Sequence, residues 1–245
     1  MTPLEHEHSR GAIAERLAAG TRHNYLRDFV YGGIDGAVTT FAVVAGTIGA
    51  DLPARIVLIL GAANLVADGF SMASSNFLGT RAERDDFLRI REIEARHINV
   101  DPEGEREEVR QIYAAKGFQG KDLESVVAFV TADNERWIST MLSEEYGLPR
   151  AIRSEWRAAA STFAAFAVCA LVPLLPFIAS VNNSFVLAVV LTGAVFFLIG
   201  SVKARWSMSA WWRSGAETFA IGAIAAVLAY LVGSVFKLFS PGGGI

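Results

Sequence analysis

The sequence predicts an all-α integral membrane protein with five transmembrane helices and a helical cytosolic domain inserted between spans two and three. The first observation is composition: 52% of the 245 residues are hydrophobic and the mean hydropathy is +0.35, which is too apolar for an ordinary soluble domain. The second is that the apolar residues form stretches of about 20 residues, the length that crosses a bilayer. The third is a charge-rich segment, residues 81–150, that divides these stretches into two groups.

Polar segments flank the apolar part of the chain. Residues 1–27 lack the apolar core of a signal peptide, so we expect a cytosolic tail with a short amphipathic helix around Ala12–Leu26. Residues 241–245 read PGGGI and are expected to form a second, short tail.

Residues 28–80 are predicted to hold the first two spans, about Phe29–Ala50 and about Ala54–Gly79, joined by the short connection Asp51–Pro53. After Gly79 there is no proline or glycine until Pro102. The second span is therefore expected to continue beyond the membrane as one long helix.

The charged segment is predicted to be helical throughout. Asp101 is expected to be an N-cap followed by a proline at the first helical position, which starts a helix over Pro102–Lys116. Gly117 would end that helix. Two more helices are expected at about Asp122–Ala132 and Asn134–Tyr146.

Residues 151–240 are predicted to hold the last three spans, about Ala158–Val181, Phe185–Lys203 and Ala216–Phe239. Tryptophans gather in the loop Arg205–Ser214, as is typical of a membrane interface.

Basic residues predict the orientation of the spans. Lysine and arginine are frequent in residues 1–27 and 81–157 and after span four, and they are scarce in the alternate loops. The positive-inside rule therefore places the N-terminus and residues 81–150 in the cytosol. A bacterial plasma (inner) membrane and a vacuolar or other endomembrane both fit this pattern. The net charge of −3 gives no indication of a nucleic-acid partner.

Polar residues inside the first two predicted spans are the first candidate site. Asp35 lies near the centre of the first predicted span, and inserting an acid at the centre of a membrane helix costs about 2.5–3.5 kcal/mol of free energy. Asn64, Asp68 and Met72 follow at i, i+4 and i+8, which places them on one helical face. Oxygen ligands with a thioether would suit Fe²⁺ better than Ca²⁺ or Mg²⁺. The alternative is that these side chains only join helices and fill space.

Gly32 and Gly36 flank Asp35 and form a GxxxG pair, which allows another helix to approach closely. The partner would be a helix of the same chain or of a second copy, and the sequence leaves both open.

The charged segment contains a second set of candidate ligands. Residues three or four apart share a helical face, so two such side chains can hold one cation. The pairs are Glu94 with His97, Glu105 with Glu108, and Met141 with Glu145. Acidic runs are also common on solvated helices, so the spacing by itself leaves both interpretations open.

Two stretches resemble a known family. YGGIDGAVTTFAVVAGTIGA and ANLVADGFSMASSNFLGTRAERD resemble the first two spans of the vacuolar iron transporter family, and the acidic insert ending in MLSEEYGLP and the five-span order also match. The resemblance implies a proton-coupled exporter of Fe²⁺, often also of Mn²⁺, that moves metal out of the cytosol. It further implies a homodimer, surrounded by membrane lipid, with a pore between the protomers.

The resemblance also implies roles for particular residues. Asp35 matches the pore aspartate and Met72 the pore thioether, whereas Asn64 stands where many members have a glutamate, which Asp68 could replace. The matching positions of the cytosolic metal-binding domain are Glu94, His97, Glu105, Glu108, Met141 and Glu145, with His97 in place of a usual glutamate. The expected partners are divalent metal ions and protons, and no prosthetic group is expected.

Two other functions remain as alternatives to a non-enzymatic transporter. A membrane-tethered di-iron oxidase would need two Glu-x-x-His units and two further glutamates, and this chain offers one unit. A non-transporting, metal-sensing membrane protein would use the acidic domain as a docking surface.

Overall fold

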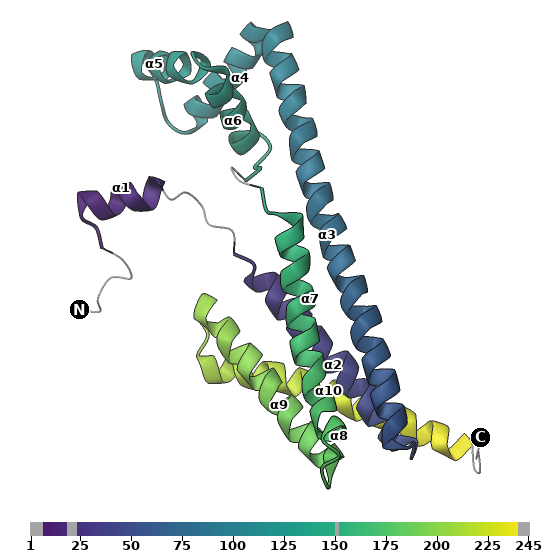
Figure 1. Ribbon diagram of the computed structural model, residues 1–245. Coiled ribbons are helices and arrows are strands. Elements are labelled where there is room, and N and C mark those ends of the chain that lie inside the picture. Colours follow the sequence, from purple (N-terminus) through teal and green to yellow (C-terminus); the bar gives the residue numbers. More distant parts are fainter. Residues whose placement is uncertain (1–6, 19–23, 150–151, 240–245) are drawn as a thin grey trace. The chain divides into compact units, whose positions relative to one another are not determined.

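A computed structural model describes residues 7–18, 24–149 and 152–239, and all regular structure within these ranges is helical (Figure 1). The predicted tail at 241–245 and parts of the predicted tail at 1–27 lie outside the described residues. The chain divides into two compact units. Unit 1 comprises Met1–His23 and Gly79–Ser154, and unit 2 comprises Asn24–Leu78 and Glu155–Ile245.

The all-helical class and the five candidate spans are confirmed. Among the described residues, five helical segments are long and apolar enough to cross a membrane. They are Leu26–Gly49, Ala54–Val100, Glu155–Ile178, Ser184–Trp206 and Trp211–Leu238.

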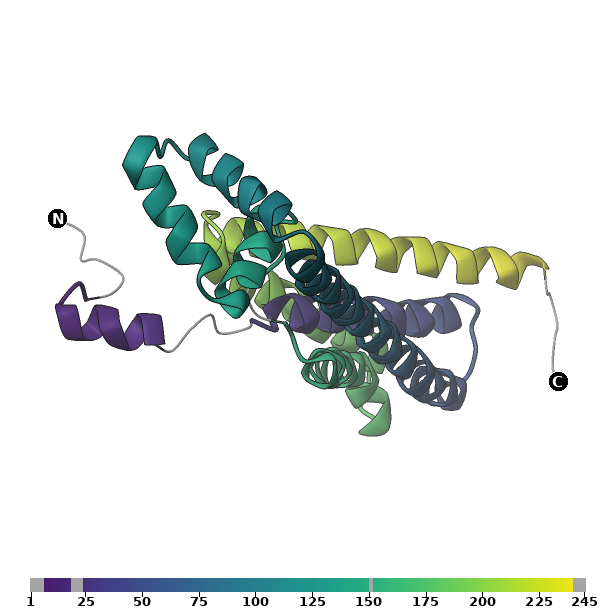
Figure 2. The ribbon, with the colours of Figure 1, turned by 90° about the horizontal axis from the view of Figure 1, so that it is seen from above.

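Unit 2 is built around α2 (Leu26–Gly49), which packs against α7 (Glu155–Leu171), α9 (Ser184–Lys203) and α10 (Trp211–Phe239). Figure 2 shows α10 running alongside α2. Small residues of α2 allow this crowding, since a helix without large side chains can be approached on several faces.

The GxxxG pair of α2 faces α7 of the same chain. A Cβ atom at Gly32 would collide with the carbonyl oxygen of Thr162, and a Cβ atom at Gly36 would collide with that of Phe166. The pair therefore serves helix packing inside the protomer, which answers a question that the sequence leaves open.

The long helix predicted after span two is present as α3 (Ala54–Val100), because no proline interrupts these residues. The predicted cap of the next helix is also present: the Asp101 side chain accepts a hydrogen bond from the Gly104 backbone N–H at 3.1 Å. α4 (Pro102–Ala115) then begins with a proline at its first turn.

Three predicted boundaries differ from the structure. The span predicted over Ala158–Val181 is interrupted: α7 ends at Leu171, and η1 (Val172–Leu174) and α8 (Leu175–Ile178) follow. The cause is the proline in each of these short segments, since proline has no N–H to donate.

At the N-terminal side, the described part of the expected helix is α1 (Arg10–Ala18); Asn24 and Tyr25 are not helical, and Leu26 already belongs to α2. The Leu26 N–H donates to the Asn24 side chain at 2.7 Å, which fixes the start of α2. Span five begins at Trp211, and not near Ala216, so part of the predicted Trp-rich loop is helical.

Unit 1 packs the last turns of α3 against α4, α5 (Gly120–Thr131) and α6 (Asn134–Glu144). Its buried core comprises Ile90, Ile98, Val109, Val127, Val130, Trp137, Ile138, Met141 and Leu142.

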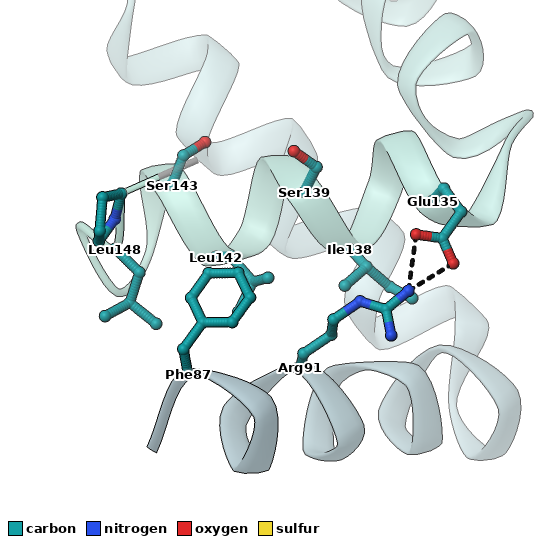
Figure 3. Close-up of a pocket in the computed structure, with 9 residues that line it drawn as sticks. Phe87, Arg91, Glu135, Ile138, Ser139, Leu142, Ser143 and Leu148 are labelled. Atoms are coloured by element: carbon teal, nitrogen blue, oxygen red, sulfur yellow. Dashed lines mark hydrogen bonds and ion pairs between the residues drawn. The ribbon is translucent and has the colours of Figure 1, made fainter. Parts of the chain in front are cut away.

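An ion pair holds the start of α6 on α3, as Figure 3 shows: the Arg91 guanidinium lies 2.7 Å from both carboxylate oxygens of Glu135. Beside this ion pair lies a pocket of about 170 Å³, whose lining includes Phe87, Ile138 and Leu142. Both partners are substantially exposed, so the ion pair orients α6 more than it stabilises the fold.

Candidate metal sites

The turn between α3 and α4 brings three potential metal ligands together. Glu94 and His97 lie near the end of α3, and Glu105 lies in the first turn of α4. One ligand atom from each lies within 4.8 Å of the other two. The Asp101 cap sets the direction of α4 and so positions Glu105 opposite the other two side chains.

The geometry of this cluster suits one cation. His97 Nδ1 lies 3.3 Å from Glu105 Oε1 and 3.9 Å from Glu94 Oε1. The side chains of Glu94 and Glu105 are 1% and 7% exposed, whereas that of His97 is 44% exposed. The cluster therefore combines two buried carboxylates with an imidazole that solvent can reach.

The electrostatics of the cluster favour positive charge. Burial, followed by the negative charges of Glu94, Glu108, Glu145 and Asp101, raises the pKa of Glu105 to about 7. Burial and the charges of Glu94 and Glu108 also raise the pKa of Glu145. A bound dication would relieve both the repulsion and the desolvation.

Two buried oxygens in the cluster lack hydrogen bonds. Glu94 Oε2 and Glu105 Oε2 are inaccessible to solvent, and neither bonds to any residue that the structure describes. A buried acceptor without a donor costs about 1–3 kcal/mol, and more when it is charged. Metal coordination would satisfy both atoms.

Sequence reasoning missed Tyr146, whose hydroxyl donates a hydrogen bond to Glu94 Oε1 at 3.0 Å. Burial and the hydrogen bond to Glu94 raise the pKa of Tyr146, so the phenol stays a donor. Its position directly after Glu145 was the available signal.

The other predicted ligands of unit 1 are placed differently. Glu108 and Glu145 are exposed at the edge of the cluster and act on Glu105 through their charge. Met141 is fully buried in the core of unit 1, one helical turn before Glu145. The structure thus brings Glu94, His97 and Glu105 together and leaves the other three around them.

In unit 2, Asp35 on α2 and Asp68 on α3 are both half-buried and close enough for their carboxylates to interact electrostatically. Asn64 lies one turn before Asp68 and donates from its amide nitrogen to the hydroxyls of Thr39 at 3.1 Å and Thr40 at 3.3 Å. Asn64 therefore joins α3 to α2 beside the two acids.

Met72 lines a pocket of about 250 Å³ that also contains an acid missed from the sequence. Asp28 is 2% exposed, and its carboxylate accepts a hydrogen bond from Asn76 Nδ2 at 2.9 Å. The same nitrogen donates to Thr162 Oγ1 at 2.7 Å, which connects α2, α3 and α7. Asp28 was overlooked because it precedes the apolar stretch, where an acid is unremarkable.

Comparison with known proteins identifies the family of this chain. The model of the VIT family matches residues 26–234. The vacuolar iron transporter of Toxoplasma gondii is 32% identical over 234 residues, covering 89% of this chain and 76% of that protein. Vacuolar iron transporter 1 of Arabidopsis thaliana is 32% identical over 220 residues, covering 89% and 88%. Vacuolar iron transporter 1 of Eucalyptus grandis is 30% identical over 231 residues, covering 93% of each chain.

The family match covers the first four candidate spans and most of the fifth, and the relatives are covered over most of their own length. The chain therefore belongs to the VIT family.

Proposed function

We propose that this chain is a divalent metal transporter that moves Fe²⁺, and also Mn²⁺, out of the cytosol in exchange for protons. The observation that carries the proposal is the proximity of Asp35 and Asp68, two acids on separate candidate membrane helices. Acids at such a position are expensive and are functional by default. The relatives named vacuolar iron transporters support iron as the cargo.

Proton exchange follows from the same two carboxylates. Two adjacent negative charges repel each other, and either a dication or protons can relieve the repulsion. Competition between metal and protons for one pair of acids couples their movements in opposite directions when the site opens to one side of the membrane at a time.

Unit 1 would collect metal on the cytosolic side. Its cluster offers two buried carboxylates and one imidazole, which are ligands that Fe²⁺ and Mn²⁺ accept. The charges of Glu108 and Glu145 add to the attraction for cations approaching the cluster. The membrane would be an endomembrane, as the relatives' names suggest, or a bacterial plasma membrane.

A second copy of the chain would complete the pathway. Asp68 is only half-buried in one protomer, and its α3 neighbours Val66 and Phe70 are 64% and 70% exposed. An acid facing lipid is unfavourable, so this face of α3 would be covered by the same face of a partner, as in a two-fold dimer.

The alternative of a di-iron oxidase gains no support from the geometry. That chemistry calls for two Glu-x-x-His units, and the described residues bring together one cluster, formed by Glu94, His97 and Glu105.

The test is metal flux in proteoliposomes with an imposed pH gradient. We expect Fe²⁺ and Mn²⁺ to cross the membrane in the direction opposite to the proton flow, and to do so faster than Ca²⁺ or Mg²⁺. The reason is that a thioether and an imidazole favour transition metals. Flux of none of these ions above that of empty liposomes would refute transport. Flux that ignores the pH gradient would refute proton coupling.

A further inference from the structure

Tyr146 makes the two oxygens of Glu94 unequal. The phenol donates to Glu94 Oε1 at 3.0 Å, whereas Glu94 Oε2 is buried and bonds to no described residue. One oxygen is thus held in place and the other is left for a ligand. Because Glu94 is 1% exposed, water cannot readily take over the role of the phenol.

We propose that Tyr146 is a positioning residue of the metal cluster: it fixes the Glu94 carboxylate so that Oε2 coordinates the incoming dication. The inference rests on the proposed metal-collecting function of unit 1. Hydrogen bonds to the second atom of a ligand group commonly set ligand orientation and change metal affinity about 10–100-fold when removed.

The backbone around Tyr146 is held firmly enough for this role. Its N–H bonds to the Met141 carbonyl at 3.4 Å, and after it Gly147 adopts φ +64. The Leu148 N–H then closes the turn on the Leu142 carbonyl at 2.9 Å, as is typical of a helix C-terminus. At its other end α6 is tied to α3 by the ion pair between Arg91 and Glu135 (Figure 3).

A neutral donor suits this position better than a cation. An arginine or lysine on Glu94 would neutralise the carboxylate and compete with the metal, whereas a phenol orients it without adding charge. Lys116, at the end of α4, is instead paired with Glu144, with the two charged atoms 2.5 Å apart.

The test uses the full chain in lipid nanodiscs. Tyr146→Phe removes only the hydroxyl and is expected to weaken Co²⁺ and Mn²⁺ binding about tenfold. It should also change the Co²⁺ d–d absorption spectrum, because Glu94 coordinates differently. Helicity without metal should be unchanged, and the unfolding temperature should fall only modestly, because Glu94 Oε1 loses its one hydrogen-bond donor among the described residues. The matched control is Tyr113→Phe in the same unit, whose ring packs on Phe118; it should alter neither binding nor spectrum.

A double-mutant cycle tests whether Tyr146 acts through Glu94. In a Glu94→Gln background, which has already lost the charged ligand, Tyr146→Phe should have little further effect on affinity. Additive losses would overturn the proposal, as would unchanged affinity and spectrum in Tyr146→Phe. A tyrosinate absorption band on adding metal would also overturn it, because Tyr146 would then be a ligand itself.

A parallel Glu105→Gln titration separates this proposal from the proposed function. If Glu105→Gln loses metal and Tyr146→Phe does not, only the positioning role is wrong. If Glu105→Gln binds like the parent chain, the cluster collects no metal, and both the collecting function and the positioning role are wrong.

Discussion

His97 Nδ1 lies 3.3 Å from Glu105 Oε1 across the turn that joins α3 to α4. This contact combines an accessible imidazole with a buried carboxylate whose pKa is raised to about 7. Glu105 is therefore poised to exchange a proton for a metal ion near neutral pH, and this property leads to the first two predictions.

Metal binding by unit 1 should weaken in acid. Below about pH 7 Glu105 holds a proton that a metal must displace, so this group alone lowers affinity about tenfold per pH unit. Competition titrations against a fluorescent chelator, on the full chain at several pH values, measure the slope. In Glu105→Gln affinity should be lower and the slope shallower. An unchanged slope of metal affinity against pH would show that protonation of Glu105 does not compete with metal binding.

The stability of the metal-free protein should depend on pH in the opposite direction: it should increase as the pH falls. The folded-state pKa of Glu105 lies above its unfolded value of 4.5, so folding is favoured while the group is protonated. That contribution is complete below the unfolded pKa and is lost as pH rises through about 7. Glu105→Gln should therefore slow hydrogen exchange in unit 1 at about pH 8 without metal. Faster hydrogen exchange in Glu105→Gln than in the parent chain would show that ionised Glu105 stabilises the metal-free protein, which contradicts this prediction.

Close packing of α2 on α7 makes a further prediction. Gly36→Ala would push a methyl group into the Phe166 backbone, so we expect a lower unfolding temperature in detergent or loss of folded protein. The control is Gly79→Ala in α3, where a Cβ would meet nothing within 4 Å. That change should be neutral or slightly stabilising, because alanine favours helix by about 1 kcal/mol over glycine. Equal stability of both variants would mean that α2 does not pack on α7 in this way.

The amide of Asn64 should contribute to the stability of unit 2. Asn64→Leu keeps a similar volume but loses the hydrogen bonds to Thr39 and Thr40. We expect a destabilisation of about 0.5–2 kcal/mol. Thermal unfolding of the purified protein, followed by tryptophan fluorescence, measures it. A variant as stable as the parent would show that these hydrogen bonds contribute nothing net.

Much of the fold could be predicted from the sequence because long apolar stretches and missing prolines are local signals. α3 is one helix because nothing in residues 54–100 breaks it. The span predicted over Ala158–Val181 did not include the interruption after Leu171: two prolines within four residues end the helical hydrogen-bonding pattern, although the residues remain apolar.

The site was only partly predictable, because the spacing of residues along a helix shows which side chains of that helix share a face, but not which other elements they contact. It places Glu94 beside His97, but the contact of His97 with Glu105 depends on the angle of the turn at Asp101. Tyr146 follows Glu145 directly, but its contact with Glu94 joins α3 to the turn after α6 and has no counterpart in helical spacing. Spacing also gave no indication that Met141 lies fully inside the core, and its role as a ligand stays a prediction.

The central claim is that Asp35 and Asp68 carry the metal, and flux through Asp35→Ala tests it most directly. Proteoliposomes with an imposed pH gradient would compare the parent chain, Asp35→Ala and the control Asp51→Ala, whose acid is 78% exposed and paired with Lys237. We predict that Asp35→Ala inserts normally but transports no Fe²⁺, whereas Asp51→Ala transports like the parent. Normal, proton-driven Fe²⁺ flux through Asp35→Ala would contradict the account.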